Sequence, residues 1–172
     1  MEHSGKKYEF TEETIEVSGK VLHRIKAVRD FGIVKAGELG GFIEKEENLS
    51  HEGNCWVYND AMVYGNAKVY GNAVVCDDAV VCGNAIVCGY AEICDDAKIS
   101  MCSDYIFFKN WWSSGRFFTW TRSNNMWKVG CFYGTGEELI QKAYKDSEIC
   151  GREYERVVRY VESILADEKK GK

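Results

Sequence analysis

Residues 53–100 consist of eight consecutive six-residue units, and this run constrains the fold more than any other feature of the sequence. Read six at a time, the units are GNCWVY, NDAMVY, GNAKVY, GNAVVC, DDAVVC, GNAIVC, GYAEIC and DDAKIS. The third position is always small and the fifth is always Val or Ile. A period of six does not suit a helix, whereas alternate side chains of a short strand share one face. The third and fifth positions are therefore expected to point into a common interior.

The Gly, Asn and Asp residues that begin most units are expected to form the corners, because they tolerate positive φ and tight turns. Three units would close one triangular coil, which gives about three to four coils with a rise of ~4.8 Å each. The pattern continues weakly upstream, where an irregular first coil is predicted. Its inward positions would be Ile33, Leu39, Ile43 and Leu49.

The repeat resembles the hexapeptide-repeat left-handed β-helix family, in which an aliphatic residue is followed four positions later by a small one. Val57 with Ala61 and Val63 with Ala67 follow this rule. The resemblance implies a left-handed parallel β-helix. The segment 34–61 also resembles the entry region of uncharacterised proteins from phages and prophages of Gram-positive bacteria, which suggests a phage-type origin.

The flanking segments predict a mainly β protein with three parts: an N-terminal β-hairpin cap (1–33), the β-helix (34–100) and a C-terminal aromatic-rich α+β unit (101–172). The hairpin would turn at Ser18-Gly19. In the last part, strands 116–122 and 126–132 precede a helix that runs from the capping box of Thr135 and Glu138 to about Lys145. A second helix is expected to bury Tyr154, Val157, Val158, Val161, Ile164 and Leu165.

Between the fourth and sixth units, the outward positions hold apolar side chains where an isolated β-helix is expected to carry charge. Contiguous exposed apolar surface of this kind is typical of an interface. We therefore predict a homo-oligomer, with a trimer favoured because related β-helices commonly assemble in that way. The alternative is that the chain's own terminal segments cover these faces. The predicted interface residues are Val74, Cys76, Val80, Cys82, Ile86 and Cys88.

Eight cysteines would suggest a disulfide scaffold in a secreted chain, but the start of this sequence lacks the apolar core of a signal peptide. The cysteines are therefore predicted to be reduced thiols. Cys76, Cys82, Cys88 and Cys94 recur every six residues, so successive ones lie on different faces and cannot converge on one ion. Only Cys76 and Cys94 stack on one face, and two thiols are too few for zinc. No metal site and no cofactor are predicted.

Many proteins of the hexapeptide-repeat kind are acyltransferases, which typically use a His as general base at a subunit boundary. This repeat contains no His and no interrupting loop; the histidines are His3, His23 and His51. His51 is the one plausible base, although its inward register favours a capping or core role. Three converging histidines, as a carbonic anhydrase needs, are absent from the repeat, and the chain has no P-loop and no Gly-x-Ser-x-Gly motif.

Residues 101–136 hold almost half of the chain's aromatic residues and are the only basic segment, with four Lys or Arg against one Asp. Exposed rings could stack on a nucleobase while cations contact phosphate, which suits a nucleotide or RNA. The alternative is that most of these rings form a core between sheet and helices. The predicted ligand-binding residues are Trp111, Trp112, Arg116, Phe118, Trp120, Arg122, Trp127 and Lys128.

The net charge of -5 argues against general binding to duplex DNA, and no apolar stretch has the ~20 residues needed to span a bilayer. A cytoplasmic location in a host cell is expected. On these grounds the favoured interpretation is a non-enzymatic, self-associating phage-type binding protein, acting in counter-defence by sequestering a host defence protein or a signalling nucleotide. Two alternatives stay open: an acyltransferase-like hexapeptide-repeat enzyme and a structural virion component.

Overall fold

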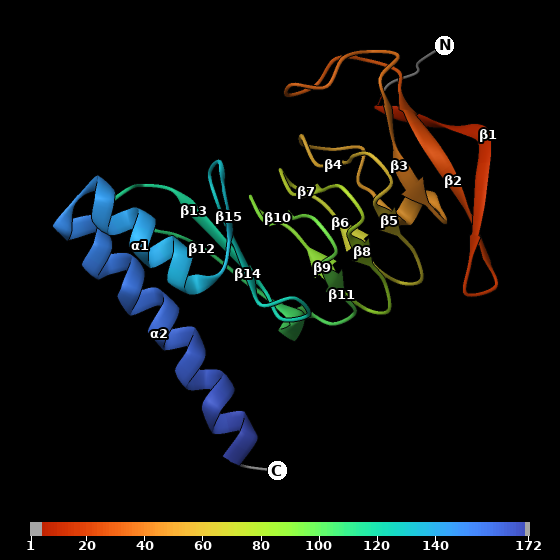
Figure 1. The fold of residues 1–172 in the computed structure, drawn as a ribbon. Helices are drawn as coiled ribbons and strands as arrows, with labels where there is room; N and C mark the ends of the chain where they lie inside the picture. Colours follow the sequence, from red (N-terminus) through yellow and green to blue (C-terminus); the bar gives the residue numbers. More distant parts are fainter. Residues whose placement is uncertain (1–4, 171–172) are drawn as a thin grey trace.

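The N-terminal hairpin continues directly into one wall of the β-helix. A computed structural model describes residues 5–170 (Figure 1). In it, β1 (Tyr8–Val17) and β2 (Lys20–Ala27) pair antiparallel around Ser18 and Gly19, which both have positive φ as the tight hairpin turn requires. The predicted hairpin is thus confirmed. β2 pairs with β3 (Leu39–Ile43), and β3 pairs in parallel with the first full coil.

The central body is a parallel β-helix of about three coils, as the repeat predicts. Partner strands lie 18 residues apart, so three six-residue units make one coil. One wall has the order β3-β5-β8-β11, a second β10-β7-β4, and a third β6-β9, which the bridge from Leu49 to Val69 extends. The strands are β4 (Trp56–Val57), β5 (Met62–Val63), β6 (Lys68–Val69), β7 (Val74–Val75), β8 (Val80–Val81), β9 (Ile86–Val87), β10 (Glu92–Ile93) and β11 (Lys98–Ile99).

The interior of the β-helix contains the third and fifth residues of each unit. Ala73 and Val75, for example, are fully buried, while Val74 between them is only half-buried. The predicted alternation is therefore confirmed. The resulting core is narrow because its side chains are mostly Ala and Val, so its stability depends on how its two ends are closed.

The first coil is irregular, as expected, but the prediction that Ile33 and Leu39 point inward is wrong. Ile43 and Leu49 are fully buried, whereas Ile33 is 85% exposed and Leu39 is 53% exposed. The chain leaves the coil between β2 and β3 as a loop that buries Phe31 and Val34 instead. The short 3-10 helix η1 (Glu46–Asn48) then replaces a strand, and its buried Asn48 donates hydrogen bonds to two backbone carbonyls of the next coil.

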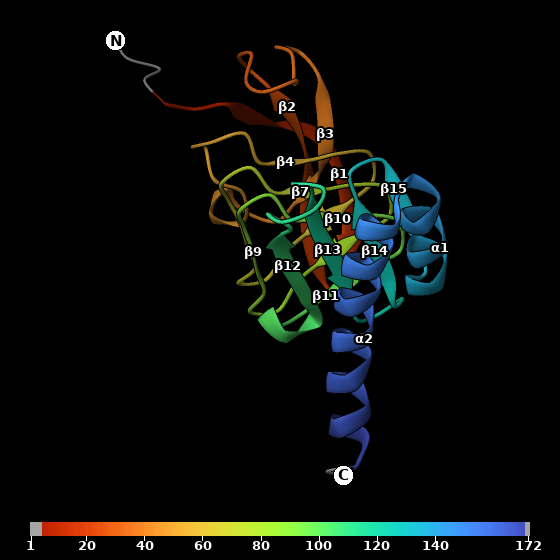
Figure 2. The same ribbon diagram turned by 90° about the vertical axis from the view of Figure 1, so that its left-hand side faces the viewer.

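The two ends of the β-helix are closed in different ways. At the N-terminal end the ring of Trp56 packs against Tyr8 and Phe31. At the other end lies an antiparallel sheet, which stands beside the last coil in Figure 1 and in front of the coils in Figure 2. The sheet follows the 3-10 helix η2 (Cys102–Asp104) and contains β12 (Tyr105–Lys109), β13 (Phe117–Thr121), β14 (Met126–Val129) and β15 (Phe132–Gly134).

Two helices cover one face of this sheet: α1 (Gly136–Asp146) and α2 (Glu148–Lys170), whose last turns project beyond it (Figure 1). The predicted capping box is confirmed, because Thr135 Oγ1 accepts from Glu138 N–H and Glu138 accepts from Thr135 N–H. The strand predicted over 126–132 is shorter in the structure. It ends at Val129, because the chain turns at Gly130, which has a φ of 58°.

No helix among residues 5–170 is both long enough and apolar enough to cross a lipid bilayer.

Candidate functional site

Three of the predicted ligand-binding residues are core residues. Phe118, Trp120 and Trp127 are between 0% and 2% exposed and pack among the side chains of α1 and α2. Neighbouring strands of the sheet direct these side chains to the covered face. Their assignment as ligand contacts was wrong, because a ring in this position has no face open to a nucleobase.

The other predicted contacts do not converge on one point. Arg122 forms two hydrogen bonds with Glu168 near the end of α2, and Lys128 pairs with Glu92 of the β-helix. Arg116 is exposed, and Trp111 is 74% exposed with the ammonium group of Lys109 over its ring. The basic and aromatic side chains of this segment therefore do not form one ligand site.

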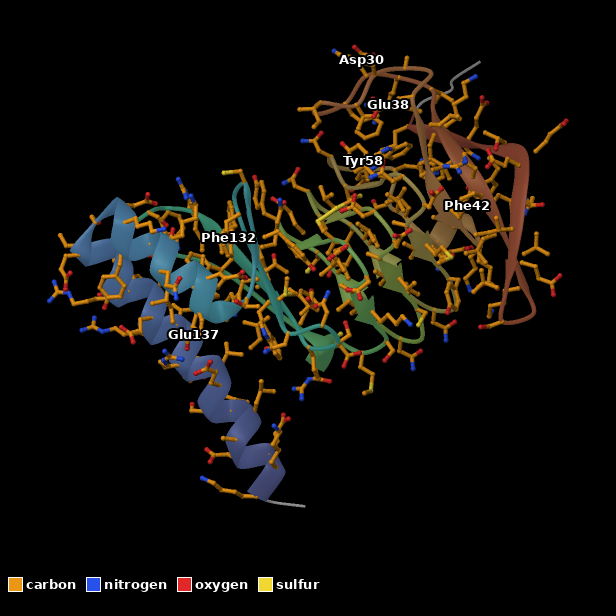
Figure 3. All side chains as sticks on the ribbon, in the orientation of Figure 1. Asp30, Glu38, Phe42, Tyr58, Phe132 and Glu137 are labelled. Carbon is orange, nitrogen blue, oxygen red and sulfur yellow. A yellow bond between two sulfur atoms is a disulfide. The ribbon has the colours of Figure 1, made fainter. Side chains whose placement is uncertain are left out.

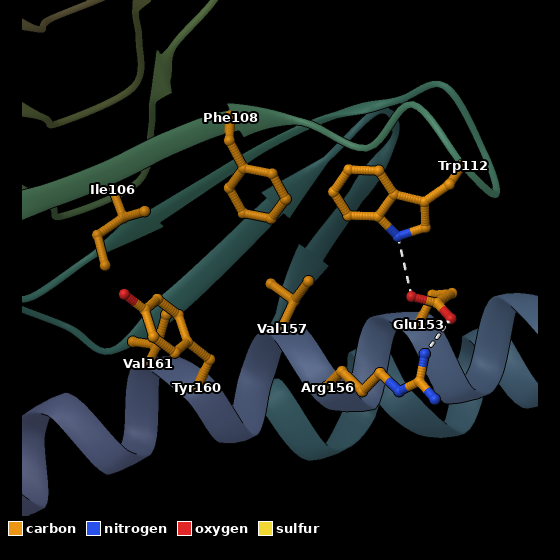
Figure 4. Close-up of a pocket in the computed structure, with 8 residues that line it drawn as sticks. All are labelled: Ile106, Phe108, Trp112, Glu153, Arg156, Val157, Tyr160 and Val161. Atoms are coloured by element: carbon orange, nitrogen blue, oxygen red, sulfur yellow. Dashed lines mark hydrogen bonds and ion pairs between the residues drawn. The ribbon is translucent and has the colours of Figure 1, made fainter.

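Trp112 does line a pocket, which lies between β12 and α2 (Figure 4). The pocket has a volume of about 350 Å³, and its Trp112 ring donates a hydrogen bond from Nε1 to Glu153 Oε2 at 2.9 Å. The sequence points to Trp112 as a site residue but not to the helix residues opposite it, because an exposed helix position and a pocket wall have the same sequence pattern. The other lining residues are Ile106, Phe108, Arg156, Val157, Tyr160 and Val161.

The predicted interface residues lie on the outside of the β-helix, spread over all three walls. Val74 and Val80 are half-buried, and Ile86 is 37% exposed. The cysteines of this set, Cys76, Cys82 and Cys88, are also half-buried and occupy the corners that follow these strands.

At one corner the prediction of reduced thiols is wrong, since Cys76 and Cys94 form a disulfide across adjacent coils (Figure 3). Their Cα atoms are 4.7 Å apart because the parallel register of β7 and β10 places the two residues side by side. With the Asp77 carboxylate, the two sulfurs make three possible metal ligands within 4.8 Å. A metal needs thiolates, however, and the disulfide uses both sulfurs.

His51 lies at the N-terminal end of the β-helix, where its ring stacks on Tyr8 with 4.2 Å between the ring centroids. Its Nδ1 accepts a hydrogen bond from the backbone N–H of Lys7 at 3.2 Å, so the neutral ring carries its proton on Nε2. Nε2 is covered, has no hydrogen-bond partner among residues 5–170, and lies 3.9 Å from a carboxylate oxygen of Glu46. Burial lowers the pKa of His51, which favours the neutral ring near pH 7.

A buried lysine lies next to this histidine. The side chain of Lys7 is fully buried, and its Nζ donates to the backbone oxygen of Cys55 at 2.7 Å and lies 3.1 Å from the Cys55 sulfur. Burial also lowers the pKa of Lys7. The polar groups of Lys7 and His51 therefore fix the first strand against the first coil.

A cleft of about 590 Å³ lies near His51, which does not line it but contacts two residues that do, Tyr8 and Arg29. It is lined by Lys6, Tyr8, Glu9, Val28 and Arg29. Lys6 forms an ion pair with Glu46, and Arg29 Nη2 lies 3.5 Å from the backbone oxygen of His51. The sequence points to His51 but not to this cleft, because the lining of the cleft comes from both ends of the hairpin. His3 lies outside the described residues, and His23 packs against Phe10.

Comparison with known proteins bears on the choice between these sites. No family model matches the chain. A stretch of 39 residues is 49% identical to part of a protein of Escherichia coli (strain K12) named an uncharacterized acetyltransferase, YdcK. The stretch is 23% of this chain and 12% of the relative, so the two are compared over a small part of each.

This similarity overturns the function favoured from the sequence. The relative is named as an acetyltransferase, which supports the acyltransferase-like alternative better than a non-enzymatic phage-type binding protein. The β-helix of about three coils agrees with a hexapeptide-repeat protein of this kind.

Proposed function

We propose that this chain is an acyltransferase of the hexapeptide-repeat kind, which moves an acyl group from a coenzyme A thioester to an amine or hydroxyl. The observation that carries the proposal is the 49% identity over 39 residues with a protein named as an acetyltransferase. Because fold alone does not determine activity, the proposal also needs a site with suitable groups.

The cleft beside His51 is the proposed place for the acyl donor. Its lining includes the cations Lys6 and Arg29, and phosphate groups such as those of coenzyme A pair well with a guanidinium. Val28, which is 43% exposed, offers an apolar surface for the remainder of the donor. The volume of about 590 Å³ is within the range of sites that hold small ligands.

In this proposal His51 acts as a hydrogen-bond donor rather than as the general base considered from the sequence. Its Nδ1 already accepts from Lys7 N–H, so the group left to act is Nε2–H, which has no partner among residues 5–170. Donation to the thioester carbonyl would stabilise the negative charge that develops there. The Lys6–Glu46 pair, whose carboxylate lies 3.9 Å from Nε2, would have to move aside to let the carbonyl reach it.

The reaction itself balances without a further reagent. The acceptor's nitrogen or oxygen forms a bond to the carbonyl carbon, and the bond from that carbon to sulfur breaks. The proton of the acceptor passes to the departing thiolate. The protein contributes position and the hydrogen bond to the carbonyl oxygen.

Acetyl coenzyme A is the first probe to use. We expect it to bind in isothermal titration, and Arg29→Ala to weaken binding by roughly 10-fold, the effect of losing one charge-assisted contact. With a panel of amine and alcohol acceptors, His51→Ala should lower kcat by about 100-fold, and His51→Gln, which keeps an N–H donor, should recover part of it. Trp111→Ala, at the opposite end of the molecule, is the matched control.

Two results would contradict the proposal. One is no binding of acetyl coenzyme A by the wild-type protein at millimolar concentration. The other is turnover that is equal in His51→Ala and the wild type while circular dichroism shows both folded.

We further propose that the protein works as a homo-oligomer, with a trimer favoured. Figure 1 shows the terminal units at the two ends of the β-helix, while the outward apolar residues belong to strands and corners of its side walls. Light scattering should give a mass near three chains, and Val80→Asp should shift it toward one, whereas Lys68→Asp at an outward but already polar position should not. A monomeric wild-type protein would refute this part.

A further inference from the structure

The pocket between β12 and α2 has apolar walls that come from two elements. Ile106 and Phe108 are alternate residues on one face of β12, and Val157 and Val161 lie one turn apart on α2 (Figure 4). The volume of about 350 Å³ is at the lower end of the range for small-molecule sites. These walls suit an apolar body and offer it no hydrogen-bonding group.

Two exposed aromatic side chains stand at the pocket, and one of them is held in place. Trp112 is 62% exposed and Tyr160 is 65% exposed. The indole of Trp112 donates to Glu153, and its backbone N–H donates to Oδ1 of Asn110, a residue that is fully buried. An exposed indole fixed from both its ring and its backbone forms a preformed wall, which lowers the entropy that a ligand must lose on binding.

At the charged end of the pocket the carboxylate of Glu153 already accepts two hydrogen bonds, whereas the guanidinium of Arg156 has N–H groups without a partner in the described part of the chain. The two oxygens of Glu153 accept from Trp112 Nε1 and from Arg156 Nη1, at 2.9 and 2.6 Å. Arg156 is 72% exposed in its side chain and makes no other hydrogen bond in the described part of the chain. A guanidinium offers five N–H donors in a planar fork, and Arg156 gives one of them to Glu153, so the group complementary to its remaining donors is an acceptor, best a carboxylate.

We propose that this pocket binds a small amphiphile with an apolar body and one carboxylate, such as a medium-chain fatty acid. The body lies between β12 and α2 against Trp112, and the carboxylate pairs with Arg156. The site is separate from the cleft near His51, because the lining of that cleft comes from the two ends of the N-terminal hairpin, which Figure 1 shows at the opposite end of the molecule from α2. The inference therefore does not depend on acyl transfer.

The test compares three probes with equal chains, each below the concentration at which it aggregates: decanoate, decanol and decylamine. We expect decanoate to bind one-to-one in isothermal titration, roughly 10-fold more tightly than decanol because of the added charge-assisted contact. Decylamine should bind most weakly, since its ammonium group meets Arg156 and both oxygens of Glu153 already accept hydrogen bonds from Trp112 and Arg156. Equal binding of all three, or no binding of decanoate, overturns the proposal.

Variants locate the binding. Arg156→Gln should reduce the affinity for decanoate to that for decanol, and Val157→Trp should abolish binding by filling the pocket. The controls are Arg152→Gln, an exposed arginine on the same helix, and Trp111→Ala, the neighbouring exposed ring. Unchanged binding in Val157→Trp overturns the proposal. A further outcome also overturns it: decanoate does not bind, and the wild-type protein self-associates in a way that Val157→Trp prevents. The occupant of the pocket is then a second copy of the chain. Binding of acetyl coenzyme A should be the same in all these variants.

Discussion

The hydroxyl group of Thr119 accepts a hydrogen bond from the backbone N–H of Glu92 at 3.1 Å, in the place where another coil would supply a carbonyl oxygen. One coil earlier, the equivalent N–H of Val74 donates to Ala91 O at 2.9 Å. Ser123 Oγ likewise accepts a hydrogen bond from the backbone N–H of Lys98 at 2.8 Å. The C-terminal sheet thus ends the β-helix by satisfying strand edges that would otherwise be open to pairing with another chain.

Removing the Thr119 hydroxyl should therefore weaken the last coil. We expect Thr119→Val to lower the free energy of unfolding by about 1–3 kcal/mol, because the N–H of Glu92 is left without a partner while the volume stays similar. Thr119→Ser keeps the hydroxyl and should recover most of this loss. Urea unfolding measures both, and equal stability of the Val variant and the wild type would show that the contact contributes nothing.

The disulfide between Cys76 and Cys94 should make stability depend on reductant. It closes a loop with a sequence separation of 18, so its reduction is expected to cost about 3 kcal/mol. Thermal unfolding with and without dithiothreitol measures the effect, and Cys76→Ser should remove the dependence. Cys82→Ser, at a corner without a disulfide, should retain it. A wild-type melting temperature that reductant does not change would contradict this prediction.

The buried and exposed tryptophans of the C-terminal unit should respond very differently to truncation. Trp127 is 2% exposed within the core between sheet and helices, so Trp127→Ala should cost about 3–5 kcal/mol. Trp111 is 74% exposed, so Trp111→Ala should change the free energy of unfolding by about 0.5 kcal/mol or less. Comparable losses of unfolding free energy in the two variants would contradict the buried position of Trp127 and the exposed position of Trp111.

A methyl group at Gly41 should not be tolerated. A Cβ atom there would lie 2.4 Å from the backbone oxygen of Ala61, which belongs to the wall of the first coil and cannot rotate away. We expect Gly41→Ala to cost about 3 kcal/mol from overpacking. Gly37→Ala, where the Cβ meets open space and only the positive φ is unfavourable, should cost about 1 kcal/mol. Denaturant unfolding of the two variants gives the comparison.

His51 should make stability depend on pH below its ordinary pKa of 6.5. Its folded-state pKa is lowered by burial, so below pH 6.5 the unfolded chain binds a proton that the folded protein does not. Unfolding free energy should then fall as pH decreases from 6.5 toward the folded pKa and stay constant with respect to this group above 6.5. His51→Gln should flatten the curve in that window. An equally steep curve in the variant would mean that other groups cause the slope.

Carboxylates contribute at lower pH. The pKa of Glu46 is lowered chiefly by its hydrogen bond with Lys6, so the stability it provides is present above the ordinary value of 4.5 and is lost as pH falls through its folded pKa. Just below pH 6.5, well above the ordinary pKa of Glu46, the slope therefore reports His51 and not this carboxylate.

The sequence by itself determined the β-helix. A small third residue and an aliphatic fifth residue in eight successive units leave one way to bury both, so Ala73 and Val75 are interior as their spacing predicts. The hairpin turn at Ser18-Gly19 and the capping box at Thr135 are likewise local, because the residues involved lie within a few positions of one another.

Only the tertiary structure decided which aromatic residues are core and where ligands could bind. Trp112 and Trp120 are both tryptophans of one basic segment, yet one is 62% exposed and the other 1%, since α1 and α2 cover a single face of the sheet. The pocket at Trp112 and the cleft at His51 each combine segments far apart in the chain. Their geometry depends on long-range packing, which residue spacing does not encode, and so the sequence could name Trp112 and His51 but not their surroundings.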